Sequence, residues 1–289
     1  MAFPIVHSLV LVTLLFLFPV VHGWGVDGHL TICKIAQGRL TEAAAAAVKE
    51  LLPSSAEDDL GSVCSWADRV KFRYHWSSAL HYIDTPDNLC TYQYNRDCKD
   101  ESGIKGRCVA GAINNYTTQL LDYNRGSTVS QYNLTEALLF LSHFVGDIHQ
   151  PLHVGFTSDR GGNTIGVHWY TRKTELHHVW DDSIIETAEE RSYNSNVEGL
   201  ITALQKNITV VWADQVKEWE ACVGSEPTCP NIYASEGIKA ACTWAYKDVS
   251  EGSTLEDDYF LSRRPIVYQR LAQGGVRLAA TLNRIFGRN

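Results

Sequence analysis

The chain has 289 residues, with 25 Lys and Arg against 33 Asp and Glu, a formal net charge of −8 and a pI near 5.7. This acidic balance argues against a protein that holds nucleic acid through a basic surface, but it does not exclude a nuclease whose positive charge comes from bound metal. The length suits one compact domain, or at most two, with a core large enough to be stable alone.

Residues 1–23 have the character of a secretory signal peptide. They contain no Lys, Arg, Asp or Glu, and Leu9–Val21 is an almost continuous apolar run. Such a run, of about 13 residues, is short for a membrane span and fits the core of a signal peptide. Val21 and Gly23 are small enough to precede a cleavage site. We therefore expect a mature chain of residues 24–289 that begins at Trp24; the alternative is a signal anchor that stays attached.

Most of the mature chain is expected to be helical. Residues 41–52 are rich in strong helix formers, with Thr41 as a cap and Pro53 as a stop. Residues 134–148 have apolar side chains at helical spacing after a capping sequence that starts at Asn133. Further helices are expected over 183–211, 236–249 and 265–285, and a short β-hairpin within the Gly-rich segment 157–170. The predicted fold class is all-α, as a single mainly helical domain.

The eight cysteines all follow the leader, and an even count in a secreted chain indicates disulfides. Zinc bound by thiolates is the alternative, but it would need Cys-x-x-Cys pairs, which the sequence lacks. Closeness in sequence favours the pairs Cys98–Cys108 and Cys222–Cys229. Cys33–Cys64 would join the first two helices, and Cys90–Cys242 would then be a long-range bridge.

Three Asn-x-Thr sequons accompany these cysteines, at Asn115, Asn133 and Asn207. Each is a candidate for N-glycosylation where the asparagine is exposed. Sequons also arise by chance, but three of them in a secreted chain predict at least one glycan.

The sharpest chemical motif is His143-x-x-x-Asp147, followed by His153. A spacing of four residues places the imidazole and the carboxylate on one helix face, where they can share an ion. Pro151 ends the helix, so His153 lies on a turn beyond it and can face a second ion. The alternative interpretation is a polar helix edge with incidental histidines.

His177 and Asp181 repeat this four-residue spacing, and His178 with Asp182 is the competing pair. Two weaker combinations are Asp68 with His81, and Trp24 with His29. If cleavage makes Trp24 the first residue, its amine and carbonyl oxygen can chelate a metal.

The candidate ligands together suit zinc better than calcium or magnesium, because imidazole, amine and carboxylate groups are mixed. Nine residues suffice for three ions if one carboxylate bridges, and Asp147 is the central choice. The candidate ligands are Trp24, His29, Asp68, His81, His143, Asp147, His153, His177 and Asp181.

These motifs resemble the plant type I (bifunctional) nucleases, which are related to fungal single-strand-specific nucleases and, more distantly, to bacterial zinc phospholipase C. The resemblance covers the mature chain and rests on Trp-x-x-x-x-His, Trp-Ala-Asp, His-Tyr-Ile-Asp, the run His-Phe-Val-Gly-Asp-Ile-His-Gln-Pro-Leu-His, and His-x-x-x-Asp. It implies a helical fold with three Zn²⁺ ions. One would be held by Asp68, His81, His143 and Asp147, a second by His153, His177 and Asp181, and a third by Trp24, His29 and Asp147.

The resemblance also implies an endonuclease that cleaves single-stranded DNA and RNA to 5′-phosphate products, with 3′-nucleotidase activity. In such a cluster the ions lower the pKa of a water molecule, while Asp68 orients it and accepts its proton. Lys71 matches a basic residue that neutralises charge in the transition state. Without the resemblance to this family, Lys71 would be interpreted as an ordinary surface lysine.

Tyr82 and Asp84 directly follow the candidate ligand His81 and resemble the family's base-binding residues. An aromatic ring can stack on a base, and a carboxylate can accept hydrogen bonds from its N–H groups. The alternative is that Tyr82 packs in the core while Asp84 caps a helix.

Two other functions compete with the nuclease. Zinc phospholipases C of this superfamily use Glu where Asp181 stands here and lack the Tyr82 and Asp84 pattern. A non-catalytic secreted zinc-binding or sugar-binding protein would be expected to lack a ligand, and none is missing. We therefore expect a monomeric nuclease of the secretory pathway, without a membrane anchor and, by resemblance, extracellular or vacuolar.

Overall fold

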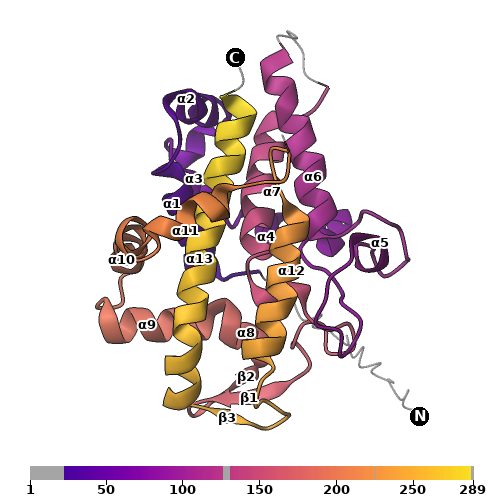
Figure 1. Cartoon of the computed structure of the whole chain (residues 1–289), viewed down its shortest axis with the longest axis vertical. Helices are drawn as coiled ribbons and strands as arrows, with labels where there is room; N and C mark the ends of the chain where they lie inside the picture. Colours follow the sequence, from indigo (N-terminus) through magenta and orange to yellow (C-terminus); the bar gives the residue numbers. More distant parts are fainter. Residues whose placement is uncertain (1–22, 126–130, 225, 288–289) are drawn as a thin grey trace, which may run out of the picture.

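The longest helix, α13 (Asp257–Phe286), runs along the long axis of the molecule, and the other elements pack around it (Figure 1). The structure is a computed structural model that describes residues 23–125, 131–224 and 226–287. The preceding helices are α1 (Val26–Gln37), α2 (Glu42–Leu51), α3 (Leu60–Val63), α4 (Trp66–Val70), α5 (Tyr94–Asp97), α6 (Val109–Leu120), α7 (Leu134–Asp147), α8 (Leu176–His178), α9 (Ile184–Ser192), α10 (Val197–Val210), α11 (Ala213–Glu220) and α12 (Pro230–Ala240).

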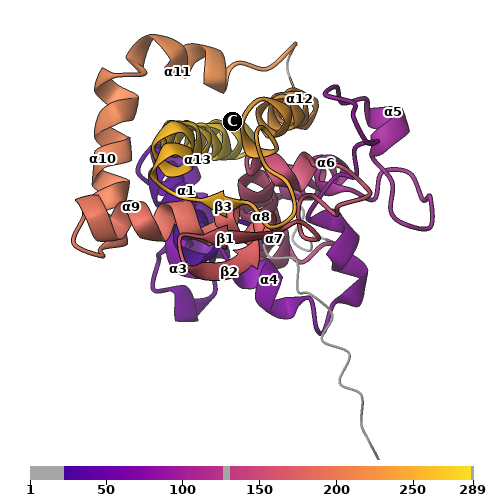
Figure 2. The same ribbon diagram turned by 90° about the horizontal axis from the view of Figure 1, so that it is seen from below.

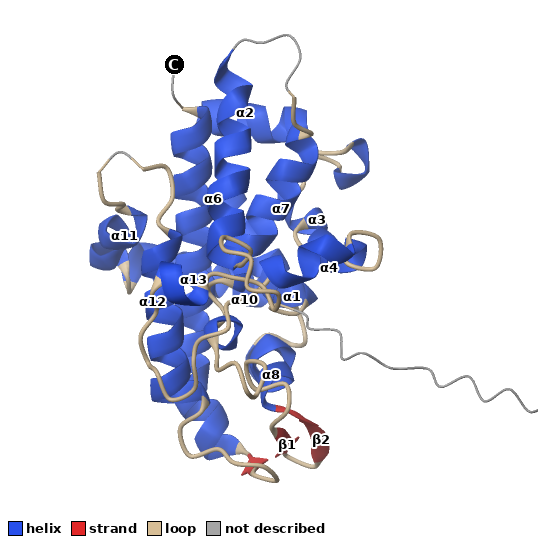
Figure 3. Ribbon diagram, turned by 90° about the vertical axis from the view of Figure 1, so that its right-hand side faces the viewer, coloured by secondary structure: helices blue, strands red, loops and turns tan. Residues whose placement is uncertain are grey.

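A small sheet closes one end of this helical body (Figure 3). Its strands are β1 (Gly166–Trp169), β2 (Arg172–Glu175) and β3 (Thr254–Leu255), in the order β2-β1-β3. β1 pairs with β2 as an antiparallel hairpin and with β3 in parallel. On one side of α13, the helices α9, α10 and α11 follow one another around it (Figure 2). The prediction of a single, mainly helical domain with a short hairpin is confirmed.

The hairpin and one long helix were predicted at the wrong bounds. The hairpin lies over 166–175, because Gly161 and Gly162 adopt positive φ angles (64° and 84°) that hold the preceding segment in a loop. The expected helix 183–211 is two helices. Asn194 has a positive φ (53°), and the side chain of Asn196 accepts a hydrogen bond from the Glu198 amide to start α10.

Two other helices begin earlier than their sequence suggested. α12 starts at Pro230, where a missing N–H costs nothing in the first turn, and passes into a π-helical turn over Ala241–Ala245. α13 starts at Asp257 and contains Pro265 in its interior. Proline there removes one helical hydrogen bond, but Phe260 and Val267, on either side of it, are fully buried. Tertiary packing therefore overrides the local stop signal.

The contact between α1 and α13 is unusually close because α13 presents glycine to it. A Cβ atom added at Gly275 would collide with the side chain of Ile35, and one at Gly274 would lie 3.1 Å from Ile32 Cδ1. Ile32 and Ile35 are both fully buried. This close approach sets the position of α1, which carries His29.

The structure forms the four expected disulfide pairs: Cys33–Cys64, Cys90–Cys242, Cys98–Cys108 and Cys222–Cys229. One of them connects elements other than those expected. Cys33 lies on α1 and Cys64 follows α3, so this bridge joins the first and third helices rather than the first two.

The predictions that concern secretion lie only partly within the described residues. The expected signal peptide lies outside them except for Gly23. Asn115 and Asn133 are exposed and Asn207 is half-buried, so glycosylation of each stays a prediction. In the part of the chain that the structure describes, no helix has the length and apolar character needed to cross a bilayer.

We expect Gly275→Ala to lower the free energy of unfolding by about 1–3 kcal/mol, because the added methyl group overpacks the α1–α13 contact. Gly38→Ala is the matched control, since a Cβ there would meet no atom nearer than 3.5 Å. Urea unfolding followed by circular dichroism measures both variants. A Gly275→Ala protein as stable as the parent would contradict the close-packing argument.

Candidate metal centre

The nine candidate ligands come from seven segments of the chain and meet in the interior. Trp24 precedes α1, His29 lies on α1, and Asp68 lies on α4. The buried helix α7 carries two of them, His81 follows a 3-10 turn, and the other three lie within short helical turns. All nine are buried: Trp24, His29, Asp68, His81, His143, Asp147, His153, His177 and Asp181. Residues that are 153 positions apart in sequence (Trp24 and His177) thus belong to one cluster.

One group of side chains gathers around the Oδ2 atom of Asp147. His81 Nδ1 lies 2.9 Å from it, and His143 Nε2 lies 3.2 Å from it. Asp68 closes this group, with its Oδ1 atom 3.5 Å from His143 Nε2 and 3.7 Å from His81 Nδ1. Two ligands of one tetrahedral zinc, each bound at about 2.0–2.1 Å, lie roughly 3.3 Å apart. The four side chains therefore have the spacing that a shared ion requires.

The other oxygen of Asp147 faces a different residue. Asp147 Oδ1 lies 3.2 Å from His29 Nε2, yet neither atom forms a hydrogen bond, although both are buried. Leaving a buried polar atom without a partner costs about 1–3 kcal/mol, so a shared cation would stabilise this pair. Asp147 can thus serve two ions, one through each oxygen.

Trp24 is held beside this position by the backbone. The Gly25 amide donates to the Asp181 carbonyl at 3.0 Å, and the His29 amide donates to the Gly25 carbonyl at 3.1 Å. A Cβ atom added at Gly23 would collide with the Asp147 carboxylate and would lie 2.9 Å from His29 Nε2. The peptide bond between Gly23 and Trp24 therefore lies next to the two side chains expected to share an ion with the Trp24 amine.

A third group contains His153, His177 and Asp181, whose ligand atoms all lie within 4.8 Å of one another. His177 Nε2 is 3.4 Å from Asp181 Oδ2. The competing pair, His178 and Asp182, is partly exposed, and its members contact each other at 3.1 Å. Of the two pairs, the buried one is therefore the better metal ligand.

Three of the histidines are oriented by backbone carbonyls, as metal-binding histidines usually are. Their Nδ1 atoms contact Cys64 O at 2.8 Å (His143), His81 O at 2.7 Å (His153) and Gly161 O at 2.6 Å (His177). A carbonyl can only accept, so in the neutral form of each ring Nδ1 carries the proton and Nε2 keeps a lone pair that a metal can take. The residues thus fit a metal in tautomer as well as in spacing.

The carboxylates of the cluster attract positive charge, while burial lowers the pKa of His81 to about 4 and that of His29 below its usual value, which keeps both rings neutral. Burial opposes a charged His143, but Asp147 and Asp68 together raise its pKa to about 10. Burial likewise opposes ionisation of Asp68, yet His143 and Lys71 hold its pKa well below the usual value. By contrast, burial and Asp182 raise the pKa of Asp181 well above the usual value. A bound cation would relieve the desolvation of all these carboxylates.

Of the residues predicted for catalysis and base binding, Lys71 contacts this cluster. Lys71 is buried, and its Nζ atom lies 2.7 Å from Asp68 Oδ1, so it is not an ordinary surface lysine. Tyr82 and Asp84 are half-buried. Burial, followed by the charge of Glu101, raises the pKa of Asp84 to about 6. Asp84 can therefore change its charge in the range where many hydrolases work.

Gln150 is a buried residue of the site that the sequence analysis did not single out. Its Nε2 atom donates to Asp181 Oδ1 at 2.6 Å, and its Oε1 atom accepts from the Leu152 amide at 2.6 Å. These contacts leave Asp181 Oδ2 directed at His177. The sequence feature that could have identified Gln150 is its position between two candidate ligands in the His143–His153 run.

A second group that the sequence did not reveal holds the turn that contains His149. Arg270 of α13 donates to the His149 carbonyl at 3.0 Å, and Arg277 contacts His149 Nε2 at 3.0 Å. Both arginines bind Glu236 of α12. His149 thus belongs to a structural network and not to the candidate ligands, although it lies in the same motif.

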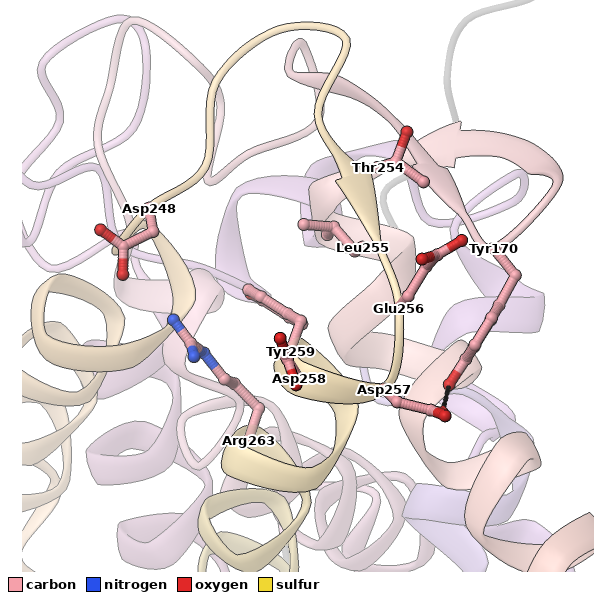
Figure 4. A pocket seen from close by; sticks show the side chains of 9 residues that line it. All are labelled: Tyr170, Asp248, Thr254, Leu255, Glu256, Asp257, Asp258, Tyr259 and Arg263. Carbon is pink, nitrogen blue, oxygen red and sulfur yellow. Dashed lines mark hydrogen bonds between the residues drawn. The ribbon is translucent and has the colours of Figure 1, made fainter.

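Two cavities differ sharply in their suitability for nucleic acid. A cleft of about 420 Å³ opens beside Trp24 and Asp68. A larger cavity, of about 660 Å³, lies where β3 meets α13 (Figure 4). Its wall carries Asp248, Glu256, Asp257 and Asp258, and Asp257 accepts a hydrogen bond from Tyr170 at 2.7 Å. Arg263 also lines this cavity and Arg191 pairs with Asp257 at 2.6 Å, so the carboxylates still outnumber the cations. The smaller cleft, which borders Trp24 and Asp68, is therefore the better substrate site.

Known proteins match this chain over nearly its whole length. The S1/P1 nuclease family matches residues 24–287. Endonuclease 2 of Arabidopsis thaliana is 72% identical over 284 residues, which cover 98% of this chain and 97% of that protein. Nuclease S1 of Aspergillus oryzae is 31% identical over 275 residues (91% and 92%), and Nuclease P1 of Penicillium citrinum is 34% identical over 275 residues (91% and 98%). The chain therefore belongs to the S1/P1 nuclease family and is a nuclease, a hydrolase that acts on phosphodiester bonds.

Proposed function

We propose that this nuclease is a zinc-dependent endonuclease that cleaves single-stranded DNA and RNA to 5′-phosphate products and also removes phosphate from 3′-nucleotides. The observation that carries the proposal is the position of Asp147. Its two carboxylate oxygens face two different sets of buried nitrogen and oxygen atoms. A carboxylate placed in this way is suited to bridge two ions.

The chain offers ligands for three Zn²⁺ ions. The first set is Asp68, His81, His143 and Asp147; the second is His153, His177 and Asp181; the third is Trp24, His29 and Asp147. When bound, the ions would supply an activated water molecule and positive charge for the phosphate. Cleavage before Trp24, passage through the secretory pathway to an extracellular or vacuolar location, N-glycosylation and a monomeric state are parts of the same proposal.

Asp68 and Lys71 would act on the reacting groups. Asp68 opens onto the cleft and is kept ionised by its neighbours, so it can orient the attacking water and accept a hydrogen bond from it. Lys71, held 2.7 Å from Asp68, places a positive charge beside the same carboxylate. A fixed cation at this position would stabilise the negative charge that develops on the phosphate.

Tyr82 and Asp84 would bind the base next to the scissile phosphate. Stacking on an aromatic ring is worth about 1–3 kcal/mol per base and accepts every base. A base must leave the duplex stack to reach such a ring, which is the physical reason for preferring single strands. Hydrogen bonds to Asp84 would add a preference for bases with N–H donors.

The test uses the secreted protein after signal cleavage. It is incubated with single-stranded DNA, RNA, a 3′-nucleotide and phosphatidylcholine, with and without EDTA, and its zinc content is counted on the same sample. We expect cleavage of both nucleic acids to 5′-phosphate ends, loss of activity with EDTA, and about three zinc ions per chain. Lipid turnover without nucleic-acid cleavage would overturn the proposal and favour a phospholipase C activity.

Replacing Gln150 tests how Asp181 is held. Gln150→Leu removes the hydrogen bond to Asp181 Oδ1, and loss of such a contact to a ligand typically lowers metal affinity about 10- to 100-fold. We expect one zinc ion to be lost at lower chelator concentration than in the parent, measured by zinc release in a chelator titration. Gln37→Leu, which changes a glutamine outside the site, is the control. Equal release curves for Gln150→Leu and the parent would contradict the positioning role.

The free amine of Trp24 generates a second prediction. A protein with one residue retained before Trp24 has an amide in place of the amine, and the retained residue occupies the space beside Asp147 and His29. We expect this extended protein to bind one zinc ion fewer and to lose most of its activity. Metal counting by atomic emission checks the stoichiometry. Full zinc content in the extended protein would show that Trp24 is not a ligand.

The pKa of Asp84 predicts a pH dependence of base recognition. Because burial raises this pKa to about 6, the accepting carboxylate is present above pH 6 and is lost as the pH falls through that value. The ratio of kcat/KM between the parent and Asp84→Asn should rise about tenfold from pH 4.5 to pH 7.5 for a guanine 3′-nucleotide, as expected for a hydrogen bond to a charged group. A ratio that is constant with pH would remove Asp84 from base binding.

A further inference from the structure

Two buried arginines of α13 lie beside the turn that follows α7, and the proposed mechanism does not use them. Arg270 and Arg277 are only 4% and 3% exposed. They share Glu236 of α12, which accepts from Arg270 Nη1 at 2.8 Å and from both terminal nitrogens of Arg277 at 2.6 and 2.8 Å. One carboxylate between two guanidinium groups leaves a net positive charge, which is costly in the interior unless other acceptors surround it.

The acceptors around Arg270 are backbone carbonyls of that turn. Its Nε atom donates to the His149 carbonyl at 3.0 Å, and one terminal nitrogen lies 3.5 Å from the Ile148 carbonyl. The carbonyls of residues 144–147, at the end of α7, already accept from N–H groups of the turn. Because buried carbonyls need donors, those of residues 148 and 149 take theirs from α13 instead.

The same arginine places a positive charge near the negative end of α7. This helix ends at Asp147, so the partial negative charge of its C-terminus adds to the charge of the carboxylate. Burial lowers the pKa of Arg270 to about 10, which leaves the guanidinium charged at neutral pH. A cation at a helix C-terminus is favourable, and here it also offsets the repulsion between Asp147 and the helix end.

The turn connects two of the proposed zinc sites. Asp147 precedes the turn and His153 ends it. Between them, Gln150 Nε2 donates to Asp181 Oδ1 at 2.6 Å, and the Gln150 carbonyl accepts from the His153 amide at 3.0 Å. His153, Asp181 and His177 form the second proposed set of ligands. A shift of this backbone would therefore move two members of that set, whereas Asp147 is held by α7 itself.

The turn is enclosed by the helices that carry these polar groups. A Cβ atom added at Gly274 of α13 would lie 3.5 Å from His149 Cγ, and one at Gly237 of α12 would lie 3.5 Å from the Ile148 carbonyl oxygen. Arg277 adds a hydrogen bond to His149 Nε2 at 3.0 Å. A displacement of Arg270 is therefore a displacement of a tightly packed segment, not of a free loop.

We propose that Arg270 is a positioning residue of this nuclease, which holds the turn 148–153 and thereby places His153 and Asp181 for one zinc ion. Glu236 and Arg277 orient its guanidinium. The inference rests on the proposed function, since it assumes zinc at the second ligand set. Arg270 acts through the backbone, so its loss weakens one ion and leaves the two sets that contain Asp147 intact.

The test follows zinc release from the secreted, zinc-loaded enzyme during titration with EDTA. Arg270→Lys keeps the positive charge but replaces the planar fork that reaches Glu236 and the carbonyls of the turn. We expect one ion to be released at about tenfold lower EDTA concentration than in the parent, as is typical when a partner of a metal ligand is lost. The other ions should be released as in the parent. Glu236→Gln, at a half-buried position, should shift the same ion by less, and it carries the test alone if Arg270→Lys does not fold.

Arg263→Lys is the matched control. Arg263 is another buried arginine of α13, and it donates to two backbone carbonyls, those of Trp244 and Lys247, which lie outside the metal centre. This variant should lower the midpoint of urea unfolding as Arg270→Lys does, but it should release zinc as the parent does. General destabilisation would instead shift zinc release in both variants.

A double variant identifies the affected ion. Gln150→Leu weakens the ion bound by Asp181, so adding Arg270→Lys to it should still leave one weakened ion. Two weakened ions would overturn the inference, because Arg270 would then act on another site. Parent-like zinc release from Arg270→Lys, or an equal shift in Arg263→Lys, would overturn it as well. Failure of the proposed function looks different, since the parent enzyme itself would then bind no zinc.

Discussion

The carboxylate of Asp147 is the group on which the candidate site depends. It is fully buried near the end of α7, where an unpaired charge would be very costly, and its two oxygens face different partners. One oxygen contacts His81 and His143, and the other lies next to His29. A buried carboxylate with so many nitrogen neighbours is stable only if protons or cations neutralise it. The stability of the packed helix α7 therefore depends on the chemistry of the site.

The surrounding scaffold orients several of the candidate ligands through hydrogen bonds. Backbone carbonyls of Cys64, His81 and Gly161 hold three of the imidazole rings. The disulfide Cys33–Cys64 ties one of these carbonyls to α1, and Arg270 of α13 holds the turn after α7 through the His149 carbonyl. Glycine at 275 lets α13 approach α1 closely. Elements outside the metal centre thus set the distances between its ligands.

Charge is distributed locally rather than over the whole surface. The protein is acidic overall, and the cavity between β3 and α13 is lined by carboxylates that repel a polyanion. The segment 69–76 next to Asp68 is basic and aromatic, and Lys71 is buried against the candidate centre. Net charge therefore argues against binding by a broad basic surface, while binding through a short basic segment and metal ions stays fully compatible with it.

The sequence by itself determined the helical class, because helix caps and apolar spacing are local signals. Closeness in sequence indicated two of the four disulfide pairs, and the motifs that resemble a known family indicated the full set of candidate ligands. Four-residue spacing places His143 with Asp147 and His177 with Asp181 on any helix. Only the tertiary structure decided which ring nitrogens face inward, that Gln150 holds Asp181, and that Phe72 stands open on the cleft wall. It also decided that α13 continues through Pro265. These features arise from contacts between segments distant in the chain, and side-chain burial and orientation exist only after those segments have packed.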